Sequence, residues 1–283
     1  MASFSLRNAT KPCSDCLITF MLAGLEYEDG SYANANTGMW LHHVVLLNLA
    51  QKDTVCPSHP ERIFASGNER TPINICANGT QKAGYHLTSS ASLLIAPELM
   101  NTSPHPRSVY ITLTYEYIPS PSPLSFSPIK LIWLDIGGCG SSEYSLPPDS
   151  EPAFSITSPA WSASISGEIT FGAAHPHDGG LDVKVLRNDE WACVSRATYG
   201  ESEGYREEGE GEGGREHEHV SGMSVCWGLG RMERGEEWGV VVRYDLDARE
   251  PMRGMHGDLE PVMGIALLYV ALDADEESED LLE

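Results

Sequence analysis

The chain has 283 residues, a hydrophobic content of 41% and a formal net charge of -23 at pH 7. This length and apolar content suit one large or two ordinary globular domains and exclude a wholly disordered chain. The acidic balance excludes nucleic acid as a partner, because binding a phosphate backbone needs clustered Lys and Arg. Much of the negative charge lies in the segments 201–218 and 273–283, and the remaining chain is only moderately acidic.

Short runs of β-branched and aromatic residues, bounded by Gly, Pro, Asn and Ser, recur along the chain, whereas helical periodicity is hard to find. They predict strands at 16–21, 40–48, 92–96, 109–117, 129–136, 163–171, 181–186, 238–244 and 262–272. This pattern is typical of all-β proteins, and we expect two tandem antiparallel β-sandwich domains of jelly-roll type. Prolines within 118–128 interrupt ladder pairing, so we place a linker there, between domains 1–122 and 123–283.

Two acidic segments interrupt this pattern. The segment 200–219 is rich in Glu and Gly and cannot bury apolar surface, so we expect a disordered surface insertion there and a solvated acidic tail at 273–283. His217 and His219 lie in the insertion. We expect only adventitious metal capture by this pair, because a flexible loop loses conformational entropy on coordination.

The number of cysteines is odd, which predicts one free thiol. They are Cys13, Cys16, Cys56, Cys76, Cys139, Cys193 and Cys226. Cys13 and Cys16 form a CxxC, but no second CxxC follows, so we expect disulfides to distant cysteines rather than a zinc site. The natural local pairs are Cys56 with Cys76 and Cys193 with Cys226.

Asn-x-Ser/Thr sequons occur at Asn8, Asn78 and Asn101. Together with the cysteines they favour an oxidising, secretory environment, and we expect a secreted, glycosylated monomer. The N-terminus has no apolar signal region, so we expect the signal segment to be missing from this sequence. The apolar run at 17–25 is too short to span a bilayer.

The motif HPHDGG contains a candidate metal site. His175 and His177 are two residues apart, and in an extended segment such residues project to the same face, so both can reach one ion. Asp178 could orient a ligating imidazole as a hydrogen-bond acceptor. The alternative is that both histidines only form hydrogen bonds at the surface.

The doublet His42 and His43, in WLHHVVL, is a second candidate. Adjacent strand residues point to opposite faces, so both can reach one ion only where the strand bulges or bends. Met263, in PVMGIALLYV, adds a sulfur donor, and nitrogen with sulfur suits copper. The alternatives are a half-buried polar pair for the doublet and core packing for Met263.

Family resemblance adds to these patterns. The runs DCLITFMLAGLEYEDGSYANANTGMWLHHVVLLN, ERIFASGNERTP, VYITLTYEY, AHPHDGG and VMGIALLYV resemble the stress up-regulated Nod 19 family over most of the chain. More distantly, an HH doublet, a later HxH and a late Met resemble the copper type II, ascorbate-dependent monooxygenases of the peptidylglycine α-hydroxylating type. That resemblance implies two jelly-roll domains, each holding one copper, that face each other across a cleft.

The same resemblance implies roles for the ligands. The oxygen-binding copper would take His175, His177 and Met263, and the electron-transfer copper would take His42 and His43. The third ligand of the latter belongs on the strand that matches 109–117, which offers Tyr115 and Glu116 but no His. The nearest substitutes are His86 and His105.

We therefore predict a copper-dependent, monooxygenase-like protein that oxidises a small-molecule or peptide substrate with dioxygen. The chain shows no flavin or nicotinamide motif, so the electrons would come from an external reductant such as ascorbate. The alternative is a non-catalytic, secreted metal-binding or interaction glycoprotein on the same fold. The missing third ligand of the electron-transfer copper supports this alternative.

Overall fold

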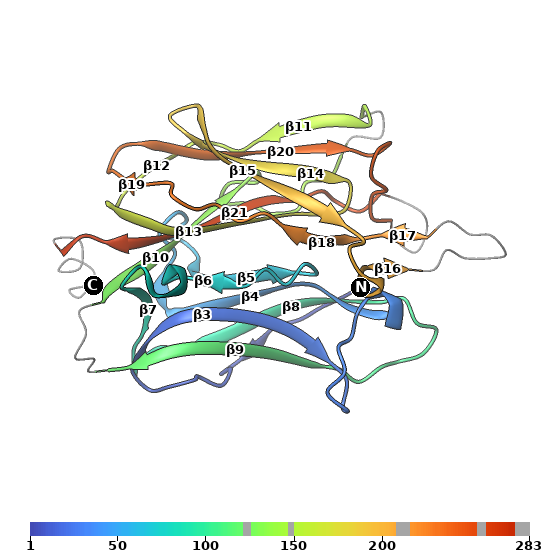
Figure 1. The fold of residues 1–283 in the computed structure, drawn as a ribbon, viewed down its shortest axis with the longest axis horizontal. Coiled ribbons are helices and arrows are strands. Elements are labelled where there is room, and N and C mark those ends of the chain that lie inside the picture. Colours follow the sequence, from blue (N-terminus) through green and yellow to red (C-terminus); the bar gives the residue numbers. More distant parts are fainter. Residues whose placement is uncertain (121–125, 147–149, 208–215, 254–258, 275–283) are drawn as a thin grey trace.

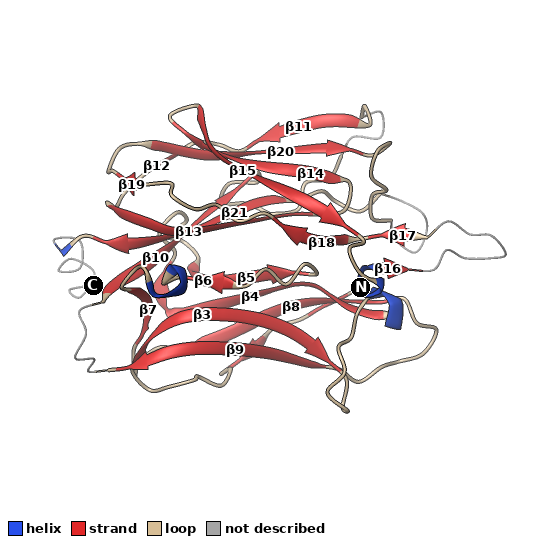
Figure 2. Ribbon diagram, in the orientation of Figure 1, coloured by secondary structure: helices blue, strands red, loops and turns tan. Residues whose placement is uncertain are grey.

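The computed structural model describes residues 1–120, 126–146, 150–207, 216–253 and 259–274 (Figure 1). Strands dominate this part of the chain, and short 3-10 turns accompany them at η1 (Ala35–Thr37), η2 (Ala77–Gly79) and η3 (Glu203–Tyr205) (Figure 2). The all-β prediction is confirmed. Within these ranges, no helix has the length and apolar character needed to cross a membrane.

The first sheet holds strands from the first half of the chain. Its order is β1 (Ala2–Ser3), β8 (Leu93–Asn101), β4 (Met39–Lys52) and β5 (Pro60–Gly67), and β2 (Leu6–Arg7) also pairs with β8. All of these pairs are antiparallel.

The second sheet combines strands from both halves. Its order is β19 (Arg231–Met232), β13 (Gly167–Pro176), β21 (Gly264–Leu272), β10 (Ser127–Asp135), β7 (Ala83–Leu87), β3 (Cys16–Glu26) and β6 (Ile73–Asn74), with β9 (Tyr110–Pro119) on β3. Strands β7 and β10 pair in parallel. In Figure 1 this sheet encloses β4, β5 and β8 between β3 and β9 on one side and β10, β13 and β21 on the other.

The third sheet forms the opposite outer layer (Figure 1). Its order is β11 (Ala153–Thr157), β20 (Glu237–Asp245), β14 (Gly180–Arg187), β15 (Glu190–Tyr199) and β18 (Val220–Met223), with β12 (Trp161–Ser162) on β20. A separate small ladder joins β16 (Arg206–Glu207) to β17 (His217–Glu218).

Strand periodicity explains how one sheet serves two hydrophobic cores. On β10, Leu131 and Trp133 pack into the core against the first sheet, whereas Ile132 and Leu134 pack into the core under the third. Successive side chains of a strand point to opposite faces, so β10 and its neighbours β13 and β21 line both cores. The two sandwiches therefore share a layer, and strands from both sides of the expected linker contribute to it.

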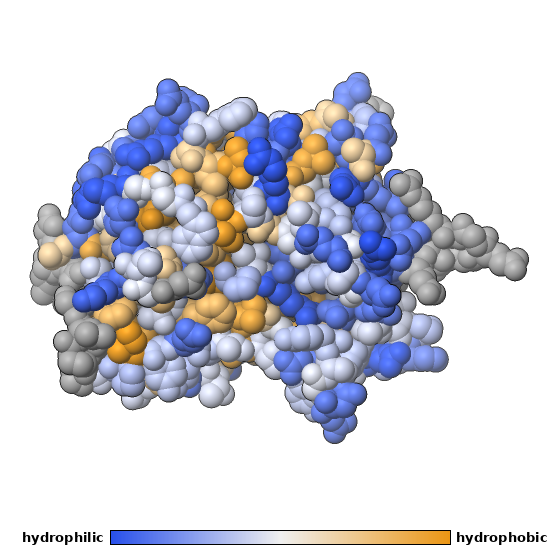
Figure 3. All heavy atoms as spheres, in the orientation of Figure 1, coloured by the Kyte–Doolittle hydropathy of each residue, from blue (hydrophilic) through white to orange (hydrophobic). Residues whose placement is uncertain are grey.

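Three predicted features lie partly outside the described residues. The boundary between 122 and 123 falls within 121–125, and most of the acidic tail falls within 275–283. The acidic segment expected to be disordered forms η3, β16 and β17 at its ends, and its residues 208–215 are not described. In Figure 3 hydrophilic residues dominate the right-hand end of the molecule, where Figure 1 places β16 and β17.

The cysteines pair differently from our expectation. Cys193 bonds to Cys226 as predicted, but Cys56 bonds to Cys139, and Cys76 is the free cysteine. The local pairing of Cys56 with Cys76 was wrong because the fold, and not sequence proximity, brings the loop after β4 against the loop after β10.

The CxxC motif also departs from its prediction, because Cys13 and Cys16 bond to each other rather than to distant cysteines.

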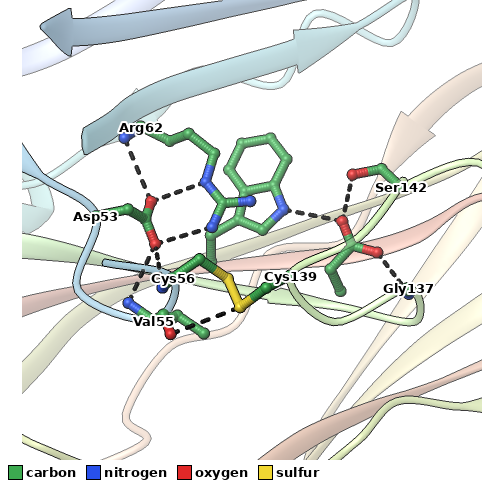
Figure 4. The surroundings of a disulfide bond; sticks show 9 residues. Asp53, Val55, Cys56, Arg62, Gly137, Cys139 and Ser142 are labelled. Carbon is green, nitrogen blue, oxygen red and sulfur yellow. Dashed lines mark hydrogen bonds and ion pairs between the residues drawn. A yellow bond between two sulfur atoms is a disulfide. The ribbon is translucent and has the colours of Figure 1, made fainter. Parts of the chain in front are cut away.

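A buried polar cluster surrounds the Cys56–Cys139 disulfide (Figure 4). The Arg62 guanidinium donates to both carboxylate oxygens of Asp53, each at 2.8 Å, and lies 4.5 Å from the centroid of the Trp133 ring. The indole N–H of Trp133 donates in turn to Asp135 at 3.1 Å. This network ties β5 of the first sheet to β10 of the second.

Candidate metal centre

A β-bulge in β4 places His42 and His43 on one side of the strand. In the ladder with β8, Leu41 pairs with Leu99 and His43 pairs with Glu98, so His42 is the extra residue. The bulge removes the strict alternation of a strand, and the two imidazole centroids lie 4.4 Å apart. The structure thus contains the distortion that a shared ion requires of adjacent histidines.

The second pair of histidines lies at the end of β13, in the neighbouring sheet. His175 is the penultimate residue of this strand, and His177 follows it directly. Nδ1 of His177 donates to the carbonyl of Pro261 at 2.7 Å, which fixes the tautomer and leaves Nε2 with a free lone pair. Nδ1 of His175 lies 3.1 Å from Oε2 of Glu69, which likewise leaves its Nε2 open.

The folded chain brings the two motifs together. The ring centroids of His42 and His177 are 4.6 Å apart, and the ring of His43 is stacked 6.0 Å from that of His177. One nitrogen from each of these three residues lies within 4.8 Å of the others. We call His42, His43 and His177 the His₃ cluster.

Unpaired buried nitrogens show that the His₃ cluster suits a metal ion. Both ring nitrogens of His42, and Nε2 of His43 and of His177, are buried without a hydrogen bond. A buried polar atom without a partner costs about 1–3 kcal/mol, so such an arrangement needs an explanation. A cation coordinated by one nitrogen of each residue would satisfy three of these atoms, and imidazole suits copper.

The electrostatics at two of the three ligands, His43 and His177, favour neutral imidazoles. Burial, with His42 and His175 nearby, lowers the pKa of His43 to about 3. Burial and the same neighbours hold the pKa of His177 well below its usual value. Only a neutral imidazole can donate to a metal, so these two ligands need no deprotonation near neutral pH.

Glu98 borders the cluster as a charged partner. Its Oε2 is 3.0 Å from Nε2 of His43 and 3.7 Å from Nδ1 of His42. Its interaction with His42 lowers its pKa to about 2, although burial opposes the shift. A carboxylate therefore stands beside the cluster at neutral pH and offsets part of a bound cation's charge.

His175 differs from His43 and His177 in the direction of its pKa shift. Burial alone would lower its pKa, but the charge and hydrogen bond of Glu69 outweigh burial and raise it. Because Glu69 favours the protonated form, a metal ion would compete with a proton for this imidazole, which it would not do at His43 or His177 near neutral pH. The rings of His175 and His177 are 5.8 Å apart.

A cavity of about 110 Å³ opens next to the cluster. His43 and His175 line it together with Met263, and most of its remaining lining is apolar. Trp133 and Ser142, from the polar network around the Cys56–Cys139 disulfide, lie on its wall. The space is large enough for a small molecule or several waters.

Met263 is held in place through its main chain. The Tyr244 hydroxyl donates to the Met263 carbonyl at 2.7 Å and accepts from its N–H at 3.2 Å. The Met263 side chain is buried in the core between the first and second sheets. Met263 therefore packs in this core and also lines the cavity beside His175.

The structure groups the predicted ligands differently from the copper type II resemblance. That resemblance assigned the doublet and His177 to two coppers across a cleft, whereas the structure joins them in the His₃ cluster. The proposed third ligands do not join it. His86 forms an ion pair with Asp15 at 3.0 Å, and His105 lies on an exposed loop.

Asp178 has a different partner from the one we expected. It accepts from Nδ1 of His219 at 2.7 Å and from the N–H of Val220 at 2.8 Å, and it does not orient His175 or His177. The carboxylates that contact histidines here are instead Glu69, which contacts His175, and Glu98, which contacts His43. Sequence reasoning missed both carboxylates, because Glu98 becomes adjacent only through the pairing of β8 with β4, and Glu69 only through the packing of the first sheet against the second.

The fold and the site define a β-sandwich protein with a buried histidine cluster that suits a metal ion. No protein-family model matches the chain. It is 32% identical over 269 residues to a probable copper-dependent oxygenase of Phoma sp., a match covering 93% of this chain and 66% of that protein. A probable copper-dependent oxygenase of Cochliobolus lunatus is 31% identical over 255 residues, covering 88% and 78% respectively.

The chain belongs to the family of these probable copper-dependent oxygenases. It spans just under two thirds of the length of the Phoma relative. Copper, the metal expected from the sequence, is the metal named for both relatives.

Proposed function

We propose that this protein is a copper-dependent oxygenase whose copper is held by the His₃ cluster. The observation that carries the proposal is the convergence of buried ring nitrogens of His42, His43 and His177 from two sheets, none of which forms a hydrogen bond at its candidate ligand atom. The names of the two relatives support the metal and the reaction class.

When bound, copper would supply the redox chemistry that lets dioxygen react with an organic substrate. In a monooxygenation, one oxygen atom enters a C–H bond of the substrate and the other leaves as water, with two electrons from an external reductant such as ascorbate and two protons. The chain's own residues would hold the ring of His177 through the Pro261 carbonyl and orient the ring of His175 through Glu69.

The cavity beside His43 and His175 would receive the substrate. Its wall is largely apolar, with Ala173, Ile265 and Leu267 among its side chains. We therefore propose a small-molecule or peptide substrate that presents an apolar group to the metal, because burial of that group against these side chains would orient it.

We also propose that the protein is exported and acts as a monomer. Three disulfides support an oxidising compartment. Of the sequon residues, Asn8 is exposed, and Asn101 is exposed with its amide donating to the His105 carbonyl at 3.2 Å. We further propose that the protein is related to the stress up-regulated Nod 19 family and, more distantly, to the copper type II monooxygenases. The HH doublet, the HxH motif and the late Met support this relation.

The test combines copper analysis with oxygen consumption. Metal-free full-length protein without a His-tag is reconstituted with Cu²⁺, dialysed and analysed for copper, and oxygen uptake is followed with ascorbate. We expect the His177→Ala variant to lose the copper of the His₃ cluster and at least about tenfold of the ascorbate-driven oxygen uptake, since one of three ligands is gone.

His86→Ala is the matched control, because His86 is an exposed histidine paired with Asp15 outside the cluster. It should retain both copper and oxygen uptake. Equal copper content in the His177→Ala and His86→Ala proteins would show that the proposal is wrong.

A further inference from the structure

A second group of metal-ligating side chains lies next to Trp40, whose ring also contacts His42 of the His₃ cluster. It consists of Asp178, His217 and His219, whose donor atoms all lie within 4.8 Å of one another. The ring of Trp40 is 5.6 Å from that of His42 and 4.7 Å from that of His219. This group shares no residue with the His₃ cluster.

The local structure explains why these side chains converge. His217 lies in β17 and His219 two residues later, so both project to the same side of an extended segment. The main chain of His219 is fixed from both directions, since its N–H donates to the Tyr205 carbonyl at 2.9 Å and its carbonyl accepts from Gly200 at 3.1 Å. Asp178 comes from the turn after β13.

The distances suit coordination of one ion. Oδ2 of Asp178 is 2.7 Å from Nδ1 of His219 and 3.6 Å from Nε2 of His217. Two ligands at about 2.0–2.2 Å from a tetrahedral metal ion are themselves about 3.3–3.6 Å apart. Small adjustments of the imidazoles would therefore admit an ion between them and the carboxylate.

The charge balance also calls for a cation. Three carboxylates contact the two imidazoles, because Glu250 lies 3.3 Å from Nδ1 of His217 and Glu207 lies 3.6 Å from Nε2 of His219, in addition to Asp178. Two protonated histidines would still leave one negative charge. A divalent ion would offset this excess.

Neighbouring arginines are engaged elsewhere. Arg206 pairs with Glu216 and Glu218, and Arg249 pairs with Glu218. Among the described residues, these ion pairs direct the nearby guanidinium charge to carboxylates outside the group. The excess around Asp178 is therefore not offset by them.

The burial of His219 supports a defined site. His219 is only 3% exposed, and its Nδ1 faces the Asp178 carboxylate. His217 is more accessible, with 19% of its side chain exposed, so an ion could enter from that side.

We propose that Asp178, His217 and His219 bind a second divalent transition-metal ion, independently of the His₃ cluster. Two imidazoles and one carboxylate form a borderline N/O donor set that suits first-row ions such as Zn²⁺ and Co²⁺ and leaves coordination positions open.

The second ion would connect two parts of the chain. Asp178 is adjacent to His177, and His217 and His219 belong to the acidic segment around β16 and β17. An ion shared by them ties this segment to the turn that carries a ligand of the His₃ cluster. The acidic segment therefore has a structural role at the metal centre rather than serving as a detached insertion.

The test separates the two sites by variants. In full-length His42→Ala/His43→Ala protein, which lacks the proposed copper ligands of β4, equilibrium dialysis against Zn²⁺ should yield one bound equivalent, and Co²⁺ should give visible ligand-field absorption. Adding His217→Ala should weaken Zn²⁺ binding at least about tenfold, because one of three ligands is lost.

Two further variants make the test decisive. His86→Ala in the same background is the control for binding by surface histidines and should leave the Zn²⁺ affinity unchanged. Asp178→Asn keeps an acceptor for the Val220 N–H but removes the ligand charge, and it should weaken binding as His217→Ala does. Cooperative unfolding of each variant verifies that it is folded.

The outcomes distinguish this proposal from the proposed function. Absence of Zn²⁺ from the His42→Ala/His43→Ala protein, or equal affinities of the His217→Ala and His86→Ala variants, would overturn the second site. Failure of the copper proposal would appear instead as equal copper content in the wild type and the His177→Ala variant.

Discussion

The imidazole rings of His42 and His177 lie 4.6 Å apart, although His42 belongs to a strand of the first sheet and His177 follows a strand of the second. The His₃ cluster therefore forms only when these two sheets pack against each other. Its geometry depends on β4 and β13, two strands with long ladders, and this rigid placement suits a metal centre better than a mobile loop would.

The ion pair between Glu69 and His175 gives a first prediction. Replacement by Glu69→Gln removes the charge that raises the pKa of His175, while burial, which lowers that pKa, remains. We expect the His175 pKa to change from above 6.5 in the wild type to below 6.5 in the variant. Titration of the imidazole C–H signals by NMR in metal-free protein measures this change.

Glu116→Gln is the matched control, since Glu116 is exposed on β9 and no shift of His175 should follow. An unchanged His175 pKa in the Glu69→Gln protein would show that another group holds the proton.

Gly67 gives a second prediction, because it pairs with His43 in the ladder between β4 and β5. A Cβ at this position would overlap the ring of His175 and the carboxylate of Glu69. Gly67→Ala should therefore lower the free energy of unfolding by about 1–3 kcal/mol, as overpacking does, and weaken copper binding. Urea unfolding and copper titration check the two effects.

Gly140→Ala serves for comparison, since its Cβ would meet only the Gly137 carbonyl, at 3.2 Å, in a turn. Its expected effect is below about 1 kcal/mol. Equal losses of unfolding free energy in the two variants would show that the close packing at Gly67 has no specific effect.

The sequence predicted much of the secondary structure. Strand periodicity located β3, β4, β10, β14, β20 and β21, with ends displaced by a few residues, but not β5 or β15. A bulge or bend was the condition under which adjacent histidines could reach one ion, and the structure contains a bulge at His42. Local rules suffice here, because side-chain alternation depends on neighbouring residues alone.

The grouping of ligands could not be read from the sequence. His42 and His177 meet because β4 and β13 lie in facing sheets, and sheet packing depends on long-range contacts that single-sequence periodicity does not encode. The same limit explains the error at Cys56, where sequence proximity favoured Cys76 over Cys139. It also explains His219, whose acidic, Gly-rich surroundings predicted exposure although the residue is buried.

The lowered pKa of His43 gives a third prediction, for metal-free protein. With a folded-state pKa of about 3 against 6.5 when exposed, His43 takes up a proton on unfolding between these values. The free energy of unfolding should therefore decrease as the pH is lowered below 6.5, by up to about 1.4 kcal/mol per pH unit for one such group. His177, whose pKa is also lowered, acts in the same direction.

Urea unfolding at pH 6 and pH 5 measures this slope. His219 does not interfere, because its pKa is raised to about 9 in the folded protein and it is largely protonated in both states below pH 6. His43→Gln should make the free energy of unfolding less dependent on pH, because the contribution of one titrating imidazole is removed. A metal-free wild type that is as stable at pH 5 as at pH 6 would contradict the buried, neutral state of His43.

The disulfide between Cys56 and Cys139 gives a fourth prediction. It joins residues 83 apart in sequence and closes the loop beside the cavity wall, where Ser142 and Trp133 lie. Cys56→Ala/Cys139→Ala should lower the free energy of unfolding by about 2–4 kcal/mol, because the unfolded chain regains the entropy of a long open loop. Cys76→Ala, which alters the free cysteine, is the control and should change it far less. Urea unfolding without reductant compares the three proteins, and a double variant as stable as Cys76→Ala would show that the Asp53–Arg62–Trp133 network holds these loops without the covalent link.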